Sequence, residues 1–439
     1  MDGPFADLGL AQPVLRAINA LGYADPTPIQ QKTIPPLLED RDVLGIAQTG
    51  TGKTAAFVLP LLSRLAGTKD RAGPKHCRAL ILVPTRELAA QITDAIASYG
   101  RNLRLHTALI VGGVKYGGQI KALARGVDIV IATPGRLEDH MGTGALHLDR
   151  ATTVVLDEAD QMFDLGFFPA IRRIMAALPA ERQTAMFSAT MPKEIQALAA
   201  DFQNNPAHIE VAPQARPIEA IDQQIIPVEP GEKPAILLKT LTDQPVTRAV
   251  IFTRTKRGAD RVAKHLAANG IKSAAIHGNK TQSQRTRALD GFRDGKTPIL
   301  VATDIAARGI DIDDVSHVFN YELPNVPEAY VHRIGRTARA GKTGTAISLC
   351  APDERAYLAD IEKLIGRTLL DDGYQPQKSA PARRRRNGKP RNRKPGGGNA
   401  GQRPARSGDQ SQRRTPNRHH GKQGNPRQGK PSQKPAKTA

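Results

Sequence analysis

The chain has 439 residues and a formal net charge of +21, and this length predicts two or three domains. Residues 376–439 hold 19 lysines and arginines against one acid, Asp409, whereas the preceding residues hold 44 basic and 41 acidic side chains. No signal-peptide pattern and no apolar run of about 18 residues occurs, so we expect a cytoplasmic protein without a membrane span. Cys77 and Cys350 lie far apart and in no metal-ligand spacing, which favours reduced thiols.

Short β-branched segments alternate with helix-patterned segments along the body of the chain. Strands are predicted in the first half at residues 42–47, 79–84, 107–111, 128–133, 153–157 and 184–188. Strands are predicted in the second half at residues 248–253, 273–277, 298–303, 317–321 and 345–349. Their nearly continuous hydrophobicity is typical of buried parallel strands joined by crossover helices. Two such series predict an α/β fold with two tandem doubly wound parallel-sheet domains.

The domain boundaries follow from composition. We predict a first domain over residues 1–205, a linker over 206–217, which contains three prolines, and a second domain over 218–375. The tail, residues 376–439, contains no Val, Ile, Leu, Met, Phe, Tyr or Trp, so it should be disordered. Its charge favours binding to phosphate backbones without sequence preference. The alternatives are a solubilising segment or a membrane-surface anchor, and no amphipathic helix supports the latter.

A glycine-rich loop, residues 47–54, follows the first predicted strand and opens a helix. Backbone N–H groups in such a loop surround a triphosphate, Lys53 would neutralise its β and γ oxygens, and Thr54 would supply an oxygen to Mg²⁺. Ala47 departs from the general pattern, which begins with Gly. A glycine-rich turn with an incidental lysine is the alternative, and the strand–loop–helix context argues against it. The predicted ATP contacts in this loop are Gln48, Thr49, Gly50, Thr51, Gly52, Lys53 and Thr54.

Residues 154–160 form a buried strand pattern that ends in carboxylates. Acids at the carboxyl end of a parallel strand face the crevice where a nucleotide would sit. Asp157 is placed to hold Mg²⁺ through its water shell, and Glu158 to orient or deprotonate the attacking water. Acids after a strand are also frequent helix N-caps. The phosphate loop upstream favours the catalytic interpretation.

At these residues the chain resembles the DEAD-box helicases of superfamily 2, since residues 157–160 spell the name of that family. The resemblance covers residues 5–373 in the family's motif order and implies two RecA-like domains that use ATP and Mg²⁺. Residues 22–30 are similar to the adenine-reading Q motif, which implies that Tyr23 stacks on the base and Gln30 hydrogen-bonds its edge. Residues 188–190 resemble the motif that couples hydrolysis to unwinding. The implied coupling residues are Asp160, Ser188 and Thr190.

The family's RNA-contacting motifs also have counterparts, at residues 84–89, 112–113, 133–136, 252–256, 282–285 and 302–311. Small residues, helix N-termini and an arginine suit close approach of a phosphate backbone. Each motif match alone is weak evidence for RNA binding, and it is their occurrence together in the family's order that supports this interpretation. The resemblance implies RNA contacts by Pro84, Thr85, Arg86, Gly113, Thr133, Arg136, Thr253 and Thr303. It also implies that Asp311 contacts the ribose of ATP.

Residues 332–339 resemble the family's sixth motif. The resemblance implies that Arg336 and Arg339 are arginine fingers, which stabilise charge on the transferring γ-phosphoryl group. Ala338 stands where the family usually has Gly, and we expect its methyl group to be tolerated because Ala is the better helix former. Residues 276–280, together with the basic tail, resemble most the bacterial RhlE branch.

The implied ATP site is split between the two domains, so hydrolysis requires closure, and RNA that spans both domains favours closure. The resemblance therefore implies an RNA-stimulated ATPase that produces ADP and phosphate. It would locally unwind or remodel RNA duplexes and RNA–protein complexes through sequence-independent backbone contacts. The RNA target, the partner proteins and the oligomeric state stay open, as does the process, which could involve ribosomal precursors, the RNA-decay machinery or cold adaptation.

Two rival functions belong to other classes. A DNA-translocating superfamily 2 motor would share the phosphate loop and the fingers, but would not be expected to carry the Q motif or residues 157–160. A non-enzymatic RNA chaperone would anneal RNA through the tail and use the core as a passive clamp. The intact Glu158, Arg336 and Arg339 argue against a passive core.

Removal of residues 377–439 is expected to weaken RNA binding and leave turnover at saturating RNA near wild type, because every predicted ATP-site residue precedes the cut. For each phosphate that the truncated protein no longer binds, the log–log salt slope should fall by about 0.7 for single strands. The measurement is RNA-stimulated ATPase of both proteins at several salt concentrations. An unchanged RNA half-saturation at low salt would contradict an electrostatic tether.

Overall fold

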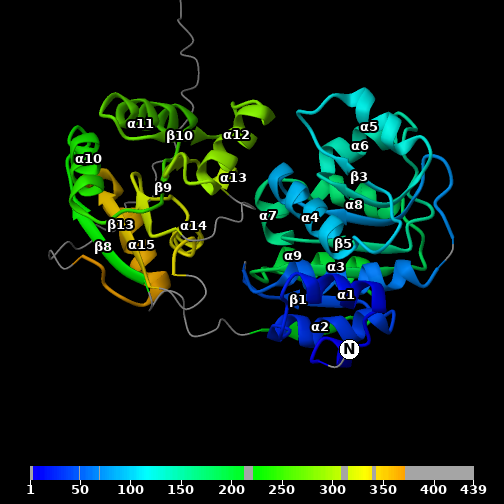
Figure 1. Ribbon diagram of the computed structural model, residues 1–439. Coiled ribbons are helices and arrows are strands. Elements are labelled where there is room, and N and C mark those ends of the chain that lie inside the picture. Colours follow the sequence, from blue (N-terminus) through cyan, green and yellow to red (C-terminus); the bar gives the residue numbers. More distant parts are fainter. Residues whose placement is uncertain are drawn as a thin grey trace, which may run out of the picture. The chain divides into compact units, whose positions relative to one another are not determined.

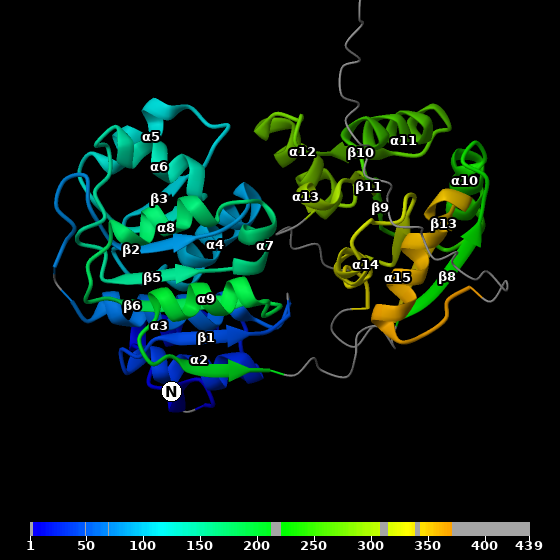
Figure 2. The same ribbon diagram turned by 180° about the vertical axis from the view of Figure 1, so that it is seen from behind.

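The computed structural model describes residues 3–48, 50–68, 70–211, 221–307, 315–338 and 343–370. Figures 1 and 2 show these residues in two opposite views, with two parallel sheets flanked by helices. The predicted α/β class with two doubly wound sheets is confirmed. The predicted tail, residues 376–439, lies outside the described residues. Among the residues that are described, no helix combines the length and the apolar character needed to cross a membrane.

The first sheet has seven parallel strands in the order β3-β4-β2-β5-β6-β1-β7. Figure 2 shows β2, β5 and β1 of this sheet one above the other. The strands are β1 (Val43–Ile46), β2 (Cys77–Leu82), β3 (Thr107–Ile110), β4 (Val127–Ala132), β5 (Thr153–Leu156), β6 (Gln183–Ser188) and β7 (Ala207–Glu210). All six strands predicted for this half of the chain are present.

Helices cover both faces of the first sheet because alternate strand residues point to opposite sides. Val43 belongs to the core beneath one helical layer, and its neighbour Leu44 to the core beneath the other. The first layer comprises η1 (Ala6–Leu8), α1 (Gln12–Ala20), α2 (Pro28–Leu38), α3 (Lys53–Ala66) and α4 (Arg86–Tyr99). The second comprises α5 (Tyr116–Leu123), α6 (Pro134–Gly142), α7 (Ala159–Asp164), α8 (Phe168–Ala176) and α9 (Lys193–Phe202).

The second sheet has six parallel strands in the order β10-β11-β9-β12-β13-β8. They are β8 (Ile221–Pro227), β9 (Ala249–Phe252), β10 (Ser273–Ile276), β11 (Ile299–Ala302), β12 (His317–Asn320) and β13 (Gly344–Cys350). One face carries α10 (Lys233–Asp243) and α11 (Lys256–Ala268). The other carries α12 (Gln282–Arg293), α13 (Asp304–Ala307), α14 (Pro327–Ile334), η2 (Pro352–Glu354) and α15 (Arg355–Ile365).

Two strands were not predicted from the sequence, and both lie at a sheet edge. β7 falls inside the predicted linker, yet it pairs in parallel with β1, so the first sheet extends to Glu210. β8 pairs with β13 over its whole length. Both strands mix polar and apolar residues, because an edge strand has one partner and more contact with solvent. A search for continuous apolar runs therefore passes over them.

The expectation for Ala338 was wrong in its physical reason. Helix α14 ends at Ile334, so Ala338 does not lie in a helix, and its backbone has a φ of 56°. That φ is in the left-handed region, where the Cβ of a non-glycine residue crowds the backbone at a cost of roughly 1–2 kcal/mol. The high helix propensity of alanine has no bearing on such a position.

Ala338→Gly is therefore expected to raise the free energy of unfolding by up to about 1 kcal/mol, the relief of strain being partly offset by the greater entropy of the unfolded chain. Ala124→Gly is the matched control, because the exposed Ala124 ends α5 with a φ of −55° and should lose stability. Urea unfolding of the three proteins checks this. Equal destabilisation by both substitutions would contradict the backbone explanation.

Candidate functional site

Parallel strands place their carboxyl ends at one edge of a sheet, and the motifs of the first domain follow those ends. Strands β3, β4 and β2, which lead to the predicted RNA contacts, are neighbours at one side of the sheet. Strands β5, β6 and β1 are neighbours at the other side; β5 and β1 lead to the predicted ATP-site residues, and β6 between them leads to the predicted coupling residues Ser188 and Thr190. Strand order therefore sorts the two predicted functions into two halves of a single edge.

The phosphate loop joins β1 to α3, which begins at Lys53. The side chain of Lys53 is buried, and its Nζ donates to the carbonyl of Ala47 at 2.8 Å. Thr51 Oγ1 donates to the carbonyl of Gln48 at 2.8 Å, so the loop is closed by its own polar groups. Gly50 has a φ of 83°. Thr49, also predicted here, lies outside the described residues.

Gln30 connects the Q-motif segment to this loop. Its Oε1 accepts from the N–H of Thr27 at 2.9 Å and caps α2, and its Nε2 donates to the carbonyl of Gly52 at 3.2 Å. Gly52 has a φ of 92°, and a Cβ there would lie 2.5 Å from Gln30 Nε2, so only glycine fits. Tyr23 is 36% exposed, and its hydroxyl hydrogen-bonds to that of Tyr99 at 2.8 Å.

Asp157 and Glu158 follow β5 and are both buried. The N–H of Glu158 donates to Asp157 Oδ1 at 3.0 Å. Glu158 has a left-handed backbone, with a φ of 55°, and its side chain makes no helix-capping hydrogen bond. Its Oε2 is buried, and no residue that the structure describes forms a hydrogen bond with it. Strain and an unsatisfied acceptor in one residue are typical of a functional site and disfavour the simple N-cap interpretation.

The electrostatics of these carboxyls follow from their burial. Burial, with the charge of Asp157 added, raises the pKa of Glu158 to about 7, against the opposing charge of Lys53. Burial also raises the pKa of Asp157, and the neighbouring Lys53 opposes that shift. A carboxyl whose pKa lies near neutrality can accept or release a proton under ordinary conditions.

Asp160 joins the carboxylate segment to the Ser-Ala-Thr turn after β6. Its Oδ2 accepts from the N–H of Ala189 at 3.1 Å, the N–H of Thr190 at 3.0 Å and Thr190 Oγ1 at 3.1 Å. Ser188 Oγ donates to the carbonyl of Thr190 at 2.7 Å. The three predicted coupling residues thus form one hydrogen-bonded unit, and a displacement of Asp160 would reach the turn directly.

The predicted RNA contacts of the first domain surround helix N-termini. Thr85 Oγ1 accepts from the N–H of Leu88 at 3.2 Å and caps α4, and Thr133 is the N-cap residue of α6. Arg86 is half-buried, and its guanidinium lies so close over Gly113 that a Cβ there would be 2.2 Å from one of its nitrogens. Pro84 is buried.

Arg136, at the start of α6, is held by a cluster of three side chains, Tyr116, Gln119 and His140, that sequence reasoning did not single out. Its guanidinium lies over the ring of Tyr116, 5.4 Å from the centroid, and donates to Gln119 Oε1 at 3.4 Å. Gln119 Oε1 also hydrogen-bonds with Nε2 of the buried His140 at 2.8 Å. The ring of Tyr116 stacks on His140 with centroids 4.2 Å apart. Because these partners come from two helices, no local spacing could have revealed them.

In the second domain the predicted residues that the structure describes are all buried. Thr253 is fully buried, and its hydroxyl donates to the carbonyl of Thr255 at 3.2 Å, so its side chain is used inside the domain. Thr303 is buried to 8% exposure, at the start of α13. Arg336 follows α14 and is 6% exposed. Asp311 and Arg339 lie outside the described residues.

The raised pKa of Glu158 predicts a pH-dependent stability. From its ordinary value of 4.5 up to about 7, the native state binds more protons than the unfolded chain, so wild-type stability should fall as pH rises through this window. Glu158→Gln removes the penalty and should stabilise the nucleotide-free protein at pH 8, by up to about 3 kcal/mol more than at pH 4.5. The two carboxyls titrate as a pair, so the midpoint belongs to both.

Urea unfolding across that pH range checks the stability prediction. Glu194→Gln, at an exposed position in the first turn of α9, makes the same chemical change without the burial. A stability difference between wild type and Glu158→Gln that is independent of pH would contradict the assigned cause.

The sequence matches the DEAD/DEAH box helicase family over residues 27–198 and the Helicase conserved C-terminal domain family over residues 232–341. It is 44% identical over 365 residues to the DEAD-box ATP-dependent RNA helicase CshA of Geobacillus kaustophilus, an alignment that covers 83% of this chain and 77% of that protein. The named CshA and DeaD relatives leave the RhlE branch a prediction.

Solved structures agree. S. cerevisiae Dbp5 bound to RNA and ADP BeF3 is similar with a TM-score of 0.74 and 31% identity, over 84% of this chain and 95% of that chain. Mss116p bound to ssRNA and AMP-PNP is similar with a TM-score of 0.74 and 29% identity, over 82% of this chain and 77% of that chain. The two sheets are therefore RecA-like, and the chain belongs to the DEAD-box family of ATP-dependent RNA helicases.

Proposed function

We propose that the carboxyl edge of the first sheet hydrolyses ATP, with Lys53 on the β and γ phosphates and Glu158 as the group that orients or deprotonates water. The observation that carries this assignment is the buried Glu158 Oε2, which has no hydrogen-bond partner among the described residues and belongs to a strained backbone. Its pKa of about 7 suits general base chemistry near neutral pH. Arg336 and Arg339 would complete the site from the second domain by stabilising charge on the transferring phosphoryl group.

The residues that would hold Mg²⁺ fit its chemistry. Asp157 offers a buried carboxylate, and Thr54, the second residue of α3, offers a hydroxyl, and both are hard oxygen donors. Among the described ranges, no three His, Cys, Asp or Glu side chains form a metal-binding group, so phosphate oxygens and water would have to complete the shell. Bound Mg²⁺ would neutralise negative charge on the phosphates.

The adenine and ribose contacts are proposed on weaker geometry. Tyr23 is exposed enough to offer a ring face to a base. The side-chain amide of Gln30 hydrogen-bonds to Thr27 and to Gly52 of the phosphate loop. A base that hydrogen-bonds to this amide would therefore act directly on the phosphate loop. Asp311 is proposed for the ribose from the sequence resemblance alone.

RNA is proposed to contact the carboxyl ends of β3, β4 and β2 in the first sheet and the carboxyl ends of β9 and β11 in the second. The N-termini of α4 and α6, with Arg86 and Arg136, offer N–H groups and positive charge to a phosphate backbone. None of these groups reads a base, so binding is proposed to be independent of sequence. Thr303 is the better candidate in the second domain, since Thr253 is fully buried.

The cellular setting is also proposed. The protein would act in the cytoplasm on structured RNA, with the basic tail as a second RNA-binding segment. Ribosomal precursors and the RNA-decay machinery are the two candidate sets of partners, and the charge of residues 376–439 is compatible with either. The proposed domains are residues 218–375 and 376–439 and a first domain that β7 extends from the predicted end at residue 205 to Glu210, which shortens the linker at its start.

Lys53→Ala is expected to abolish RNA-stimulated ATP hydrolysis and to keep the fold, because the buried Lys53, at the start of α3, directs its ammonium to the Ala47 carbonyl of the phosphate loop and is not part of the apolar core. The measurement is steady-state ATPase without nucleic acid, with DNA and with RNA, alongside a circular dichroism melt. Wild type should be stimulated by RNA and little by DNA. Lys239→Ala, on the exposed face of α10, is the control and should match wild type. Turnover of Lys53→Ala within about threefold of wild type would refute the assignment of the phosphate loop.

A further inference from the structure

Arg333 is the largest side chain that the described part of the chain buries completely, with 1% of it exposed. It lies near the end of α14, three residues before Arg336. Burying a guanidinium is costly unless its N–H groups are paired, and here four of its hydrogen bonds reach protein acceptors. The cost of burial is thus offset by contacts that also fix the direction of the side chain.

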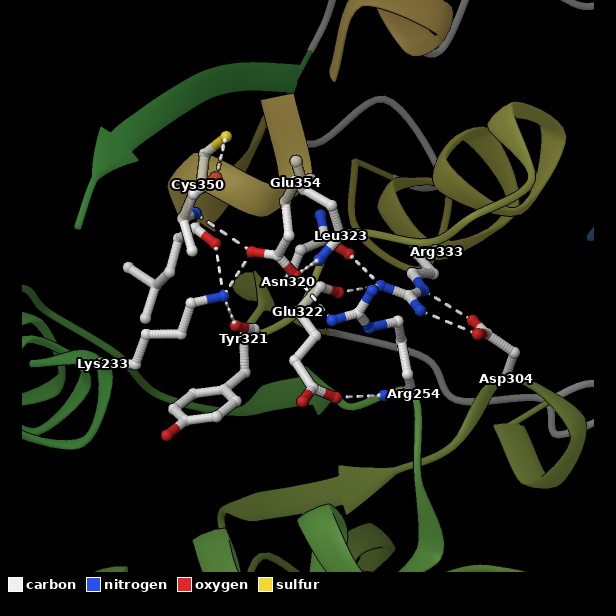
Figure 3. Close-up of polar contacts among 12 residues, drawn as sticks. Lys233, Arg254, Asp304, Asn320, Tyr321, Glu322, Leu323, Arg333, Cys350 and Glu354 are labelled. Atoms are coloured by element: carbon white, nitrogen blue, oxygen red, sulfur yellow. Dashed lines mark hydrogen bonds and ion pairs between the residues drawn. The ribbon is translucent and has the colours of Figure 1, made fainter. Parts of the chain in front are cut away.

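Figure 3 shows the guanidinium of Arg333 between Asp304 on one side and Asn320 and Glu322 on the other. Its Nε and one terminal nitrogen donate to the two oxygens of Asp304 at 2.5 and 2.7 Å, a bidentate pair. The other terminal nitrogen donates to Asn320 Oδ1 at 3.0 Å and to the carbonyl of Glu322 at 2.7 Å. The guanidinium also lies over the ring of Phe252, 5.0 Å from the centroid.

These partners come from three neighbouring strand ends. Phe252 ends β9, Asn320 ends β12, and Asp304 follows β11 after Thr303. The strands β11, β9 and β12 are adjacent in the sheet. One side chain from α14 therefore ties together the carboxyl edge of the second domain, where the RNA and phosphoryl contacts are proposed.

A backbone hydrogen bond links Arg333 to Arg336. The N–H of Arg336 donates to the carbonyl of Arg333 at 3.1 Å, so the two residues share one turn. Beyond it, Thr337 Oγ1 donates to the carbonyl of Val315 at 2.5 Å and fixes the other side of the turn. Arg336 thus lies between Arg333 and Thr337, both of which are fixed by hydrogen bonds. Of these two, Arg333 also bonds to Asp304, the residue after Thr303.

We propose that Arg333, through its pair with Asp304, is a positioning residue that holds the Arg336 turn and the Thr303 turn in a fixed relation. The inference rests on the proposed function, in which Arg336 meets the phosphoryl group and Thr303 meets RNA. The bidentate fork sets both distance and angle, which lysine could not do with a single ammonium. Loss of the fork therefore displaces Arg336 without removing it.

A second buried ion pair in the same domain supplies the control. Lys233 Nζ donates to Glu354 Oε2 at 2.5 Å and to the carbonyls of Tyr321 and Leu349 at 2.8 and 3.0 Å. Figure 3 shows Lys233 beside Tyr321 and Glu354. Lys233 begins α10, and these three partners all lie outside α14. Lys233→Met should therefore destabilise the domain and leave the Arg336 turn in place.

The test compares Arg333→Lys, Lys233→Met and wild type by thermal unfolding and by ATP hydrolysis at saturating RNA, below the melting range of every variant. For Arg333→Lys we expect kcat to fall by about tenfold or more, with the KM for ATP within about threefold of wild type, since misplacement of a catalytic group costs rate. Lys233→Met should lower the melting temperature and keep kcat. Asp304→Asn, which retains the shape of the partner, replaces Arg333→Lys if that variant does not fold.

A double-mutant cycle with Arg336→Ala separates positioning from general stability. If Arg333 acts through Arg336, adding Arg333→Lys to Arg336→Ala should change kcat by less than about twofold. A second full loss of about tenfold in the double variant would overturn the proposal, as would equal kcat for Arg333→Lys and Lys233→Met. If Arg336→Ala alone left hydrolysis unchanged, the finger assignment in the proposed function would fall, and this inference with it.

Discussion

A buried lysine and three buried carboxyls share the carboxyl edge of the first sheet, and the rest of the site is arranged around their electrostatics. Water is excluded from these groups, so each charge must find a partner or shift its pKa. Asp160 finds its partners in the turn after β6, and Lys53 finds a carbonyl of its own loop. Glu158 Oε2 has no such partner among the described residues, and burial raises the pKa of Glu158 instead. In the proposed function, this difference in hydrogen bonding gives the neighbouring acids different roles.

The parallel sheets make this concentration of polar groups possible. Every strand of the first sheet ends at the same edge, so short loops from distant parts of the sequence meet there. The strand order then separates the proposed nucleotide contacts from the proposed RNA contacts, with β2 and β5 side by side at the boundary. In the second domain Arg333 performs the equivalent task from a helix, since it draws three strand ends together.

Sequence reasoning predicted the interior of this fold well because buried parallel strands carry short apolar runs that are rich in β-branched residues. It missed β7 and β8, whose polar content reflects their edge position, and it placed Ala338 in a helix where the chain has already turned left-handed. Motif matching found Gln30 and Asp160, but only the structure shows that Gln30 holds Gly52 and that Asp160 holds the Thr190 turn. Thr253 and Arg333 illustrate a deeper limit. A residue's burial depends on strands distant in sequence, so a threonine predicted to contact RNA can be buried inside its domain, and an arginine three residues before the proposed finger Arg336 can lie in the core.

The most direct test of the central claim is a crystal structure with a non-hydrolysable ATP analogue, Mg²⁺ and single-stranded RNA. We expect Lys53 Nζ to leave the carbonyl of Ala47 and to lie within hydrogen-bond distance of a phosphate oxygen, with Glu158 Oε2 facing the γ-phosphate. A triphosphate bound away from the carboxyl edge of the first sheet would contradict the account. Lys53 still bonded to Ala47, with no phosphate nearby, would contradict it equally.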